Sequence, residues 1–188
     1  MSKRDKEKWN NKYRARDLAG EEGPRQWLED NIDLLNAHGK ALDIATGLGK
    51  NAVFLANLGY QTLGIDISEA GLEKAIALAK KKNVRIETQV VDLDSHHLKE
   101  NEYDLILCFY FLDRKLFPEI HKALKPGGLI FYETFNLDHL KYTDFKKEWV
   151  LKYNELLQAF SDFRILRYRE MDRDEKGITS LVARKPAH

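Results

Sequence analysis

A short strand followed by a glycine-containing turn and a helix is the feature that most constrains this chain of 188 residues. Residues 41–45 form an apolar run, the turn holds Gly47 and Gly49, and residues 51–58 have the spacing of an amphipathic helix. Glycine lets the backbone approach a ligand closely, and the first N–H groups of the helix point toward that ligand. The segment therefore predicts an α/β domain with an adenosine-containing cofactor at this turn.

The rest of the chain alternates between apolar segments and helical patterns, which predicts a parallel sheet with ligands at the carboxyl ends of its strands. We expect strands at 40–45, 61–66, 84–91, 103–109 and 129–134. We expect helices at 6–16, 24–35, 51–58, 68–82 and 115–124, with Ser68 capping the fourth of them. Two final strands, 163–170 and 178–183, are joined by residues 172–177, a connection too short for a helix, so they form an antiparallel hairpin.

Acidic residues lie in or directly after three of these strands: Asp43, then Asp66 in Gly64-Ile-Asp66, then Asp92 in Val90-Val91-Asp92-Leu93. Together with the glycine turn and Leu124-Lys-Pro-Gly-Gly128, this ordered set resembles the class I S-adenosylmethionine (SAM) dependent methyltransferases. The resemblance extends from about residue 9 to residue 185. It implies a Rossmann-like, seven-stranded, mostly parallel sheet of order 3-2-1-4-5-7-6.

The resemblance also implies which residues contact SAM. The cofactor-binding candidates are Asp43, Ala45, Gly47, Gly49, Asp66, Ile67, Asp92, Leu93 and Cys108. Among these, the family pattern assigns the ribose hydroxyls to Asp66 and the adenine side to Asp92. The chain departs from the pattern at Ala45, where the family usually has glycine, and the extra methyl group narrows the room beside the methionine moiety.

A nicotinamide-binding Rossmann domain is the alternative interpretation, because Gly47-Leu-Gly49-Lys-Asn-Ala52 also fits its motif and Asp66 follows at a suitable distance. A dinucleotide needs a second mononucleotide-binding half, for which this chain has little room. Asp43 and Asp92 have no part in that motif. These differences favour SAM.

The acceptor side is less well specified, because methyl transfer needs alignment more than dedicated catalytic groups. The segments 111–118 and 130–135 and the opening Trp9-Asn-Asn-Lys-Tyr13 resemble the tellurite-resistance and thiopurine types of this family. Lid and pocket candidates are Trp9, Tyr13, Arg16, Tyr110, Phe111 and Phe135, and catalytic candidates are Glu133, Asp113 and Arg114. Glu133 instead fits a salt bridge with Arg114 or Arg16, Asp113 fits a helix cap, and the three later aromatic residues fit a core.

Composition restricts the function classes further. The net charge of +1 provides no field for nucleic acid or anionic lipid, and no Cys/His spacing of zinc type occurs, so we expect no metal. Cys108 is the only cysteine, which suits a reducing cytoplasm, and its place in a strand predicts a buried residue rather than a nucleophile. We expect a cytoplasmic single-domain enzyme, residues 1–188, acting on a small molecule. A non-catalytic SAM-binding subunit of a partner protein is the alternative.

Residues 1–23 are expected to form a lid. The segment from Lys6 to Gly23 is rich in charge and poor in aliphatic side chains, so it should be poorly held without ligand. Trp9 and Tyr13, one helical turn apart, give it an apolar edge that needs a surface to cover.

Overall fold

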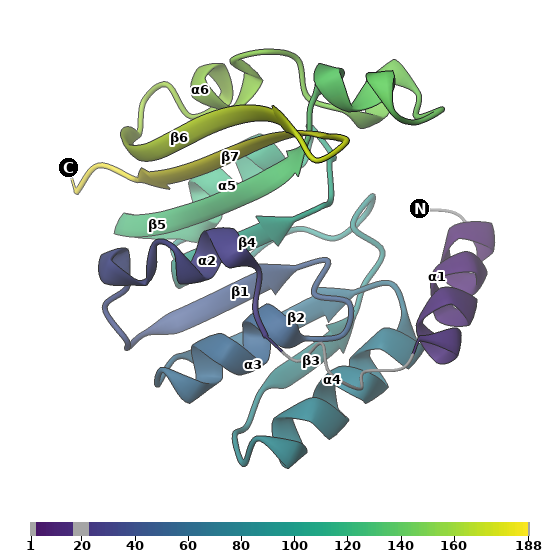
Figure 1. Ribbon diagram of the computed structural model, residues 1–188. Helices are drawn as coiled ribbons and strands as arrows, with labels where there is room; N and C mark the ends of the chain where they lie inside the picture. The colour runs from purple at the N-terminus through teal and green to yellow at the C-terminus, as the bar shows by residue number, and fades with distance from the viewer. Residues whose placement is uncertain (1–2, 17–22, 188) are drawn as a thin grey trace. The chain divides into compact units, whose positions relative to one another are not determined.

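The computed structural model of the protein describes residues 3–16 and 23–187. Its contacts divide the chain into two compact units, residues 1–97 and 98–188 (Figure 1). The organisation as a single domain stays a prediction.

The first unit alternates helices and parallel strands. In chain order its elements are α1 (Lys3–Ala15), α2 (Gln26–Glu29), the 3-10 helix η1 (Ile32–Leu34), β1 (Lys40–Ile44), α3 (Lys50–Asn57), β2 (Gln61–Asp66), α4 (Glu69–Lys81) and β3 (Glu87–Val90). β2 pairs in parallel with both β1 and β3. The carboxyl ends of the three strands, where the sequence motifs lie, therefore share one edge of this sheet.

Three predictions for this unit are wrong in extent. α1 begins at Lys3 rather than at residue 6. The helix expected at 24–35 is broken into α2 and η1, and the Asn31 side chain donates to the Trp27 carbonyl over 2.8 Å, competing with the helical backbone pattern. The third strand begins at Glu87 rather than at residue 84, because the Val84 N–H still bonds to the Ala79 carbonyl in α4. The Ser68 cap is confirmed, since its hydroxyl accepts the Gly71 N–H.

The second unit contains the end of the parallel sheet and the terminal hairpin. Its elements are β4 (Tyr103–Phe109), α5 (Leu116–Ala123), β5 (Leu124–Phe135), the 3-10 helices η2 (Leu137–Lys141) and η3 (Lys147–Trp149), α6 (Glu155–Ala159), β6 (Arg164–Arg173) and β7 (Lys176–Arg184). β4 and β5 are parallel, whereas β7 is antiparallel to both β5 and β6. The hydrogen-bonded strand order of the sheet is β3-β2-β1-β4-β5-β7-β6, which confirms the predicted topology.

Three details of this unit differ from the predictions. β5 begins at Leu124, five residues early, because Leu124 pairs with Tyr103 before a register shift. The final connection is shorter than residues 172–177: Arg173 pairs with Lys176, and Asp174 and Glu175 both have positive φ, which matches a type I′ hairpin turn. The sequence pattern assigns no element to residues 136–162, where η2, η3 and α6 lie.

Candidate functional site

The turn after β1 has a left-handed backbone at three positions. φ is +54° at Ala45, +56° at Gly47 and +71° at Gly49. The turn is fixed by the Thr46 N–H, which donates to the Ile65 carbonyl over 3.0 Å, and by the Gly49 N–H, which donates to the Thr46 carbonyl. Left-handed backbone costs a residue with a side chain roughly 1–2 kcal/mol, so Ala45 holds the glycine conformation under strain.

Asp43 is the acidic residue of β1 and is almost fully buried. Its carboxylate accepts the Thr46 hydroxyl over 2.5 Å. Burial raises the pKa of Asp43 to about 7, and the charge of Asp66 acts in the same direction while the Thr46 hydrogen bond opposes both. The predicted site thus contains a buried carboxyl group that titrates near neutral pH.

Asp66, the last residue of β2, is bonded to the backbone on both sides of the site. One carboxylate oxygen accepts the Gly47 N–H over 2.8 Å, and the other accepts the Ser68 N–H over 2.8 Å. The side chain is 5% exposed, and burial raises its pKa. An ionised carboxylate can accept about four hydrogen bonds, so acceptor capacity remains for ligand hydroxyls. This geometry fits the ribose role that the family pattern implies.

The residues after β2 and β3 line the same strand ends. Ile67 and Leu93 are buried, and Asp92 lies half-buried two residues beyond β3. The Asp92 carboxylate accepts the Asp94 N–H over 3.1 Å, so Asp92 begins a turn. The assignment of Asp92 to the adenine side of the cofactor stays a prediction.

α1 packs against α4 and covers the glycine turn with an aromatic ring. Trp9 and Tyr13 stack with ring centroids 5.6 Å apart, which confirms their predicted pairing. The Tyr13 hydroxyl oxygen lies 2.6 Å from where a Cβ on Gly47 would stand, and the ring lies 3.0 Å from the corresponding point on Gly71. Burial and the charge of Asp66 raise the pKa of Tyr13. Two glycines therefore make the space that this ring occupies.

Asn10 is a site residue that the sequence reasoning missed. Its side chain is 7% exposed, and its carbonyl oxygen accepts the Ser68 hydroxyl over 2.7 Å and the Ala70 N–H over 3.1 Å. It thereby caps α4 from outside that helix. An isolated glycine inside the α4 pattern, Gly71, was the available signal that another element approaches there.

The remainder of the expected lid is partly described. Arg16 is exposed, and the ammonium group of Lys74 donates to its carbonyl. Lys6 forms a 2.6 Å ion pair with Glu69 at the start of α4. Residues 17–22, which include most of the expected glycine-flanked break, lie outside the described residues.

α4 also approaches the turn at a second point. A Cβ on Gly49 would collide with the Cβ of Ala75, and the Ala75 Cα would lie 3.0 Å away. Only the smallest side chains let helix and turn meet at this distance.

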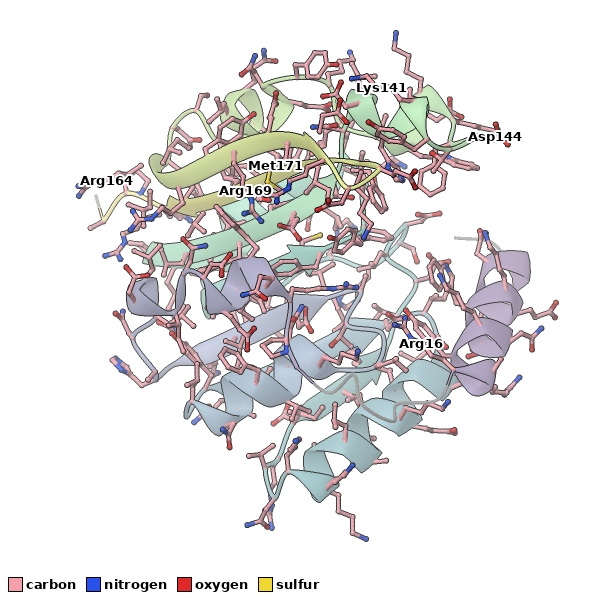
Figure 2. The ribbon with its side chains drawn as sticks, in the orientation of Figure 1. Arg16, Lys141, Asp144, Arg164, Arg169 and Met171 are labelled. Carbon is pink, nitrogen blue, oxygen red and sulfur yellow. The ribbon has the colours of Figure 1, made fainter. Side chains whose placement is uncertain are left out.

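In the second unit, Glu133 has partners other than those expected. The Ser180 hydroxyl donates to its carboxylate over 2.6 Å, and the Arg169 guanidinium lies 3.5 Å from the same oxygen. The three residues face one another across β5, β7 and β6, and Figure 2 labels Arg169 on β6. The predicted pairing of Glu133 with Arg114 is wrong, because the Arg114 guanidinium is engaged elsewhere. Whether Glu133 acts as a base stays a prediction.

Arg114 binds the segment that follows β5 through several hydrogen bonds. Its guanidinium binds both carboxylate oxygens of Glu155, over 2.6 and 3.0 Å, and also donates to the carbonyls of Glu148 and Val150. Asp113 accepts the Lys115 N–H over 3.0 Å in the turn before α5, in line with its capping alternative. These contacts give both catalytic candidates structural roles.

The remaining candidates follow or belong to β4 and β5. Cys108 is fully buried, as predicted, and its thiol lies 3.7 Å from the Phe111 carbonyl, which also accepts the Tyr132 hydroxyl. Tyr110, Phe111 and Phe135 are half-buried rather than core residues. The Tyr110 and Phe135 rings lie 5.1 Å apart.

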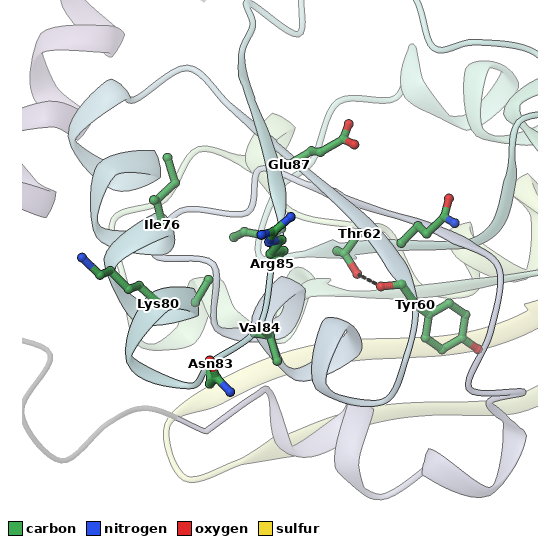
Figure 3. A pocket seen from close by; sticks show the side chains of 11 residues that line it. Tyr60, Thr62, Ile76, Lys80, Asn83, Val84, Arg85 and Glu87 are labelled. Carbon is green, nitrogen blue, oxygen red and sulfur yellow. Dashed lines mark hydrogen bonds between the residues drawn. The ribbon is translucent and has the colours of Figure 1, made fainter.

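A shallow pocket of about 680 Å³ lies elsewhere in the first unit (Figure 3). Its walls come from the beginning of β2, the last turns of α4 and the segment leading into β3, and Lys80, Arg85 and Glu87 are among the side chains that line it. These elements mark the amino ends of the strands, whereas the cofactor motifs lie at the carboxyl ends. The pocket is therefore not the predicted cofactor site.

Two features of the described residues, 3–16 and 23–187, bear on other functions. No cluster of three or more His, Cys, Asp or Glu side chains there is placed to hold a metal ion. No helix in that part of the chain has the length and apolar character needed to cross a membrane.

Comparison with known proteins agrees with the geometry. A family model described as a methyltransferase domain matches residues 41–128, a range that contains the glycine turn, β2 to β4 and all of β1 except its first residue. Hemagglutinin 1 of Eikenella corrodens is 30% identical over 140 residues, covering 70% of this chain and 46% of that protein. The probable S-adenosyl-L-methionine-dependent methyltransferase TehB of Haemophilus influenzae is 29% identical over 139 residues, covering 70% of this chain and 48% of its own. The chain thus spans about half the length of these curated relatives.

The fold comparison covers more of the chain. The crystal structure of TehB from Haemophilus influenzae superposes with a TM-score of 0.70 over 96% of this chain and 66% of that one, at 21% identity. At that identity the likeness shows the fold. With the strand order, the acidic residues at the strand ends and the family model, it leads to one assignment: the chain belongs to the class I SAM-dependent methyltransferases, whose methyl donor is S-adenosyl-L-methionine.

Proposed function

We propose that this protein transfers the methyl group of SAM to a small-molecule acceptor by in-line displacement. The observation that carries the proposal is the double backbone anchoring of Asp66 beside the left-handed glycine turn. This arrangement presents a carboxylate and glycine backbone together at the carboxyl end of the parallel strands, where doubly wound sheets bind nucleotides.

SAM supplies a methyl group already activated by its sulfonium. The chain's own residues then have to bind SAM and the acceptor, orient them for the transfer and exclude water. Asp66 would accept the ribose hydroxyls, Asp92 would serve the adenine side, and Ile67 and Leu93 would supply apolar walls. Tyr13 on α1 would cover the turn and keep water from the transfer geometry.

The acceptor class rests on features of the described residues. The net charge is +1 and the exposed lysines and arginines are interspersed with acidic residues, so the chain lacks the field expected for a nucleic-acid substrate. The segments 136–154 and α1 are short additions to the fold that suit a small acceptor better than a polymer. Cys108 as a buried thiol is compatible with the cytoplasm, where we place the protein.

The test is titration calorimetry with SAM and with S-adenosylhomocysteine (SAH), followed by incubation with labelled SAM and a panel of thiols, phenols, amines and chalcogen oxyanions. We expect saturable binding of both cofactor forms and label on at least one small acceptor. Absence of heat with both, together with saturable NAD binding, would refute the proposal. Label that appears only on macromolecules of a lysate would refute the small acceptor.

A non-catalytic SAM-binding subunit is the second candidate, and Ala45 is the observation that favours it. A strained alanine in place of glycine adds a methyl group beside the methionine end of the predicted site. Binding of SAH without transfer to any acceptor would support this alternative.

A further inference from the structure

Exposed aromatic side chains are concentrated in one short segment of the second unit. Among the described residues, the aromatic side chains that stand largely in solvent are Tyr142, Phe145, Trp149 and Tyr153. All lie within residues 136–154, drawn in green between β5 and α6 in Figure 1. Exposed apolar surface gathered in one place is typical of a binding site.

Some of these rings belong to a continuous chain of contacts that we call the aromatic face: Tyr110, Phe135, His139, Phe145 and Trp149. Phe135 stacks on His139 with centroids 3.9 Å apart and planes 8° from parallel, and Phe145 meets both edge-on. Trp149 extends the chain at 6.1 Å from Phe145, and Tyr110 extends it at the other end. The face thus leads from the carboxyl ends of β4 and β5, the side of the sheet that binds ligands, to solvent.

The backbone beneath the exposed rings is firmly held. Val150 and Leu151 are fully buried, the Leu151 N–H donates to the Phe135 carbonyl over 2.9 Å, and Arg114 donates to the Val150 carbonyl. Phe145 remains 41% exposed and Trp149 53% exposed on this support. Simple core packing does not explain large apolar side chains that are held in place yet left in water.

Tyr110 carries a second sign of function. It has a φ of +54°, which is unusual for a bulky residue, and its N–H donates to the Glu133 carbonyl over 2.7 Å. Strain of this kind persists where the surrounding structure holds it, and such residues cluster at ligand sites.

His139 gives the face a polar group. Its ring is 6% exposed, and its Nδ1 is buried without a hydrogen-bond partner, the one such side-chain atom among the described residues. Burial and the nearby Lys176 cation lower the pKa of His139, so the ring is neutral at physiological pH. A neutral imidazole left unpaired among aromatic rings is available to a polar substituent on a ligand once the rings adjust to it.

Charge restricts the ligand. The ammonium group of Lys146 lies over the Trp149 ring, 5.3 Å from its centroid, and Lys176 acts on His139. A cationic ligand would compete with Lys146 for the Trp149 ring, and both Lys146 and Lys176 would repel it. Neutral planar rings can stack or meet these side chains edge-on without that penalty.

We propose that the aromatic face binds the methyl acceptor and selects a neutral molecule with a planar aromatic ring. This rests on the proposed transferase function. In the transfer, a sulfur or oxygen on the acceptor forms the bond to the methyl carbon. The bond between methyl and sulfonium breaks with its electron pair going to sulfur, and the acceptor's proton goes to solvent. Phe145 and Trp149 determine specificity, and His139 is a positioning residue.

The test uses matched thiols, phenylmethanethiol and cyclohexylmethanethiol, which present the same CH₂–SH group on a flat or a puckered ring. Calorimetry on the full chain saturated with SAH measures their affinities. We expect the aromatic thiol to bind more tightly, and Trp149→Leu to reduce that preference about fivefold, the size of one aromatic contact. Tyr142→Leu, an exposed aromatic residue outside the face, is the control and should leave the preference unchanged.

The outcomes separate the two proposals. If SAH binds and the two thiols bind equally, or neither binds, the aromatic face is not the acceptor site. If Trp149→Leu and Tyr142→Leu behave alike, the assignment to this face is wrong. In a third outcome, SAH does not bind, but phenylmethanethiol still binds and its affinity depends on Trp149. That result would support the aromatic face as a binding site and refute the transferase proposal. His139→Gln should weaken the aromatic thiol without changing SAH affinity, and a loss of SAH binding in this variant would contradict the positioning role.

Discussion

The side-chain oxygen of Asn10 accepts the Ser68 hydroxyl over 2.7 Å, and this contact joins α1 to the residue that begins α4. Ser68 in turn donates its N–H to Asp66, the proposed ribose ligand. α1 and the proposed cofactor site are therefore connected through consecutive polar contacts within one unit of the chain.

Replacement of Asn10 should weaken both the attachment of α1 to α4 and the binding of the cofactor. Asn10→Ala leaves the buried Ser68 hydroxyl and Ala70 N–H without their acceptor, which costs about 1–3 kcal/mol for each unsatisfied group. We expect a lower free energy of unfolding in urea and weaker SAH binding by calorimetry. Asn11→Ala, its exposed neighbour, is the control and should change neither. Equal behaviour of the two variants would remove Asn10 from the site.

Hydrogen exchange tests whether α1 is a gate. If the segment closes on the cofactor, amides of residues 5–16 should exchange faster without SAH than with it, because Tyr13 packs on the same turn that SAH would contact. Strong and equal protection in both states would identify α1 as a fixed structural helix, and its contacts with Glu69 and Ser68 would then be sufficient to hold it.

Ala45→Gly should relieve backbone strain in the turn. The gain is roughly 1–2 kcal/mol from left-handed backbone, reduced by about 0.4–1 kcal/mol for the greater entropy of glycine in the unfolded chain. Ala37 also has a positive φ, +56°, but lies outside the cofactor turn, so Ala37→Gly is the matched control. Thermal unfolding should show both variants at least as stable as the parent. Only Ala45→Gly should alter SAH affinity, and no change there would show that the alanine methyl group does not reach the methionine moiety.

The ribose role of Asp66 can be separated from its structural role. Asp66→Ala removes the acceptor of two backbone N–H groups and should destabilise the turn whatever its ligand. Two ribose hydrogen bonds to a charged acceptor are worth about 1.5–3 kcal/mol each. The parent protein should therefore bind SAH much more tightly than its 2′,3′-dideoxy analogue, whereas Asp66→Ala should bind both similarly. Asp92→Ala should keep the difference, and persistence of the difference in Asp66→Ala would exclude the ribose assignment.

Asp43 should make stability depend on pH. Its pKa is about 7 in the folded chain and about 3.9 in the unfolded chain, so between these values the folded state holds a proton that the unfolded state has released. The free energy of unfolding should therefore fall as pH rises from about 4 to about 7, with a limiting slope of about 1.4 kcal/mol for each step of one in pH. Asp43→Asn should flatten this dependence in ligand-free protein, and the exposed Asp33→Asn should not. A stability that rises through this window in the parent, without an opposing group to account for it, would contradict the burial argument.

Arg114 and Glu155 should be coupled energetically. The guanidinium holds the carboxylate with two hydrogen bonds, and neither lysine nor glutamine reproduces that fork. A double-mutant cycle of Arg114→Lys and Glu155→Gln should give a coupling of about 0.5–3 kcal/mol in the free energy of unfolding. Additive effects would show that the backbone carbonyls of Glu148 and Val150, rather than Glu155, are the important partners of Arg114.

The sequence predicted the topology because its signals are local. Glycine ends some of the elements, apolar periodicity indicates their type, and acidic residues mark the ends of strands, so β1, β2 and β4 lie within a residue of their expected bounds. The predicted boundaries of an element were wrong where a contact between residues distant in sequence determines where the element begins or ends. β5 is extended by its pairing with Tyr103, and the hairpin is closed by left-handed backbone at Asp174 and Glu175, although glutamate is not a residue that such turns favour.

The site was predictable to a lesser degree. Asp43, Asp66 and the glycine turn belong to one contiguous pattern and lie together in the first unit. Asn10 and the aromatic face were not recognised, because their importance arises from partners distant in sequence: Ser68 lies 58 residues from Asn10. The same reason explains the wrong partner for Glu133, whose neighbours Ser180 and Arg169 come from the hairpin strands.

The meeting of Gly49 and Ala75 has a consequence for engineering this enzyme family. Because a Cβ on Gly49 would collide with Ala75, the turn and α4 are already as close as two backbones with minimal side chains allow. Redesign for bulkier sulfonium analogues therefore gains no volume from either position. Random mutagenesis should find both positions almost intolerant of enlargement, while the replaceable volume lies with Tyr13, whose ring fills the space that Gly47 and Gly71 leave open.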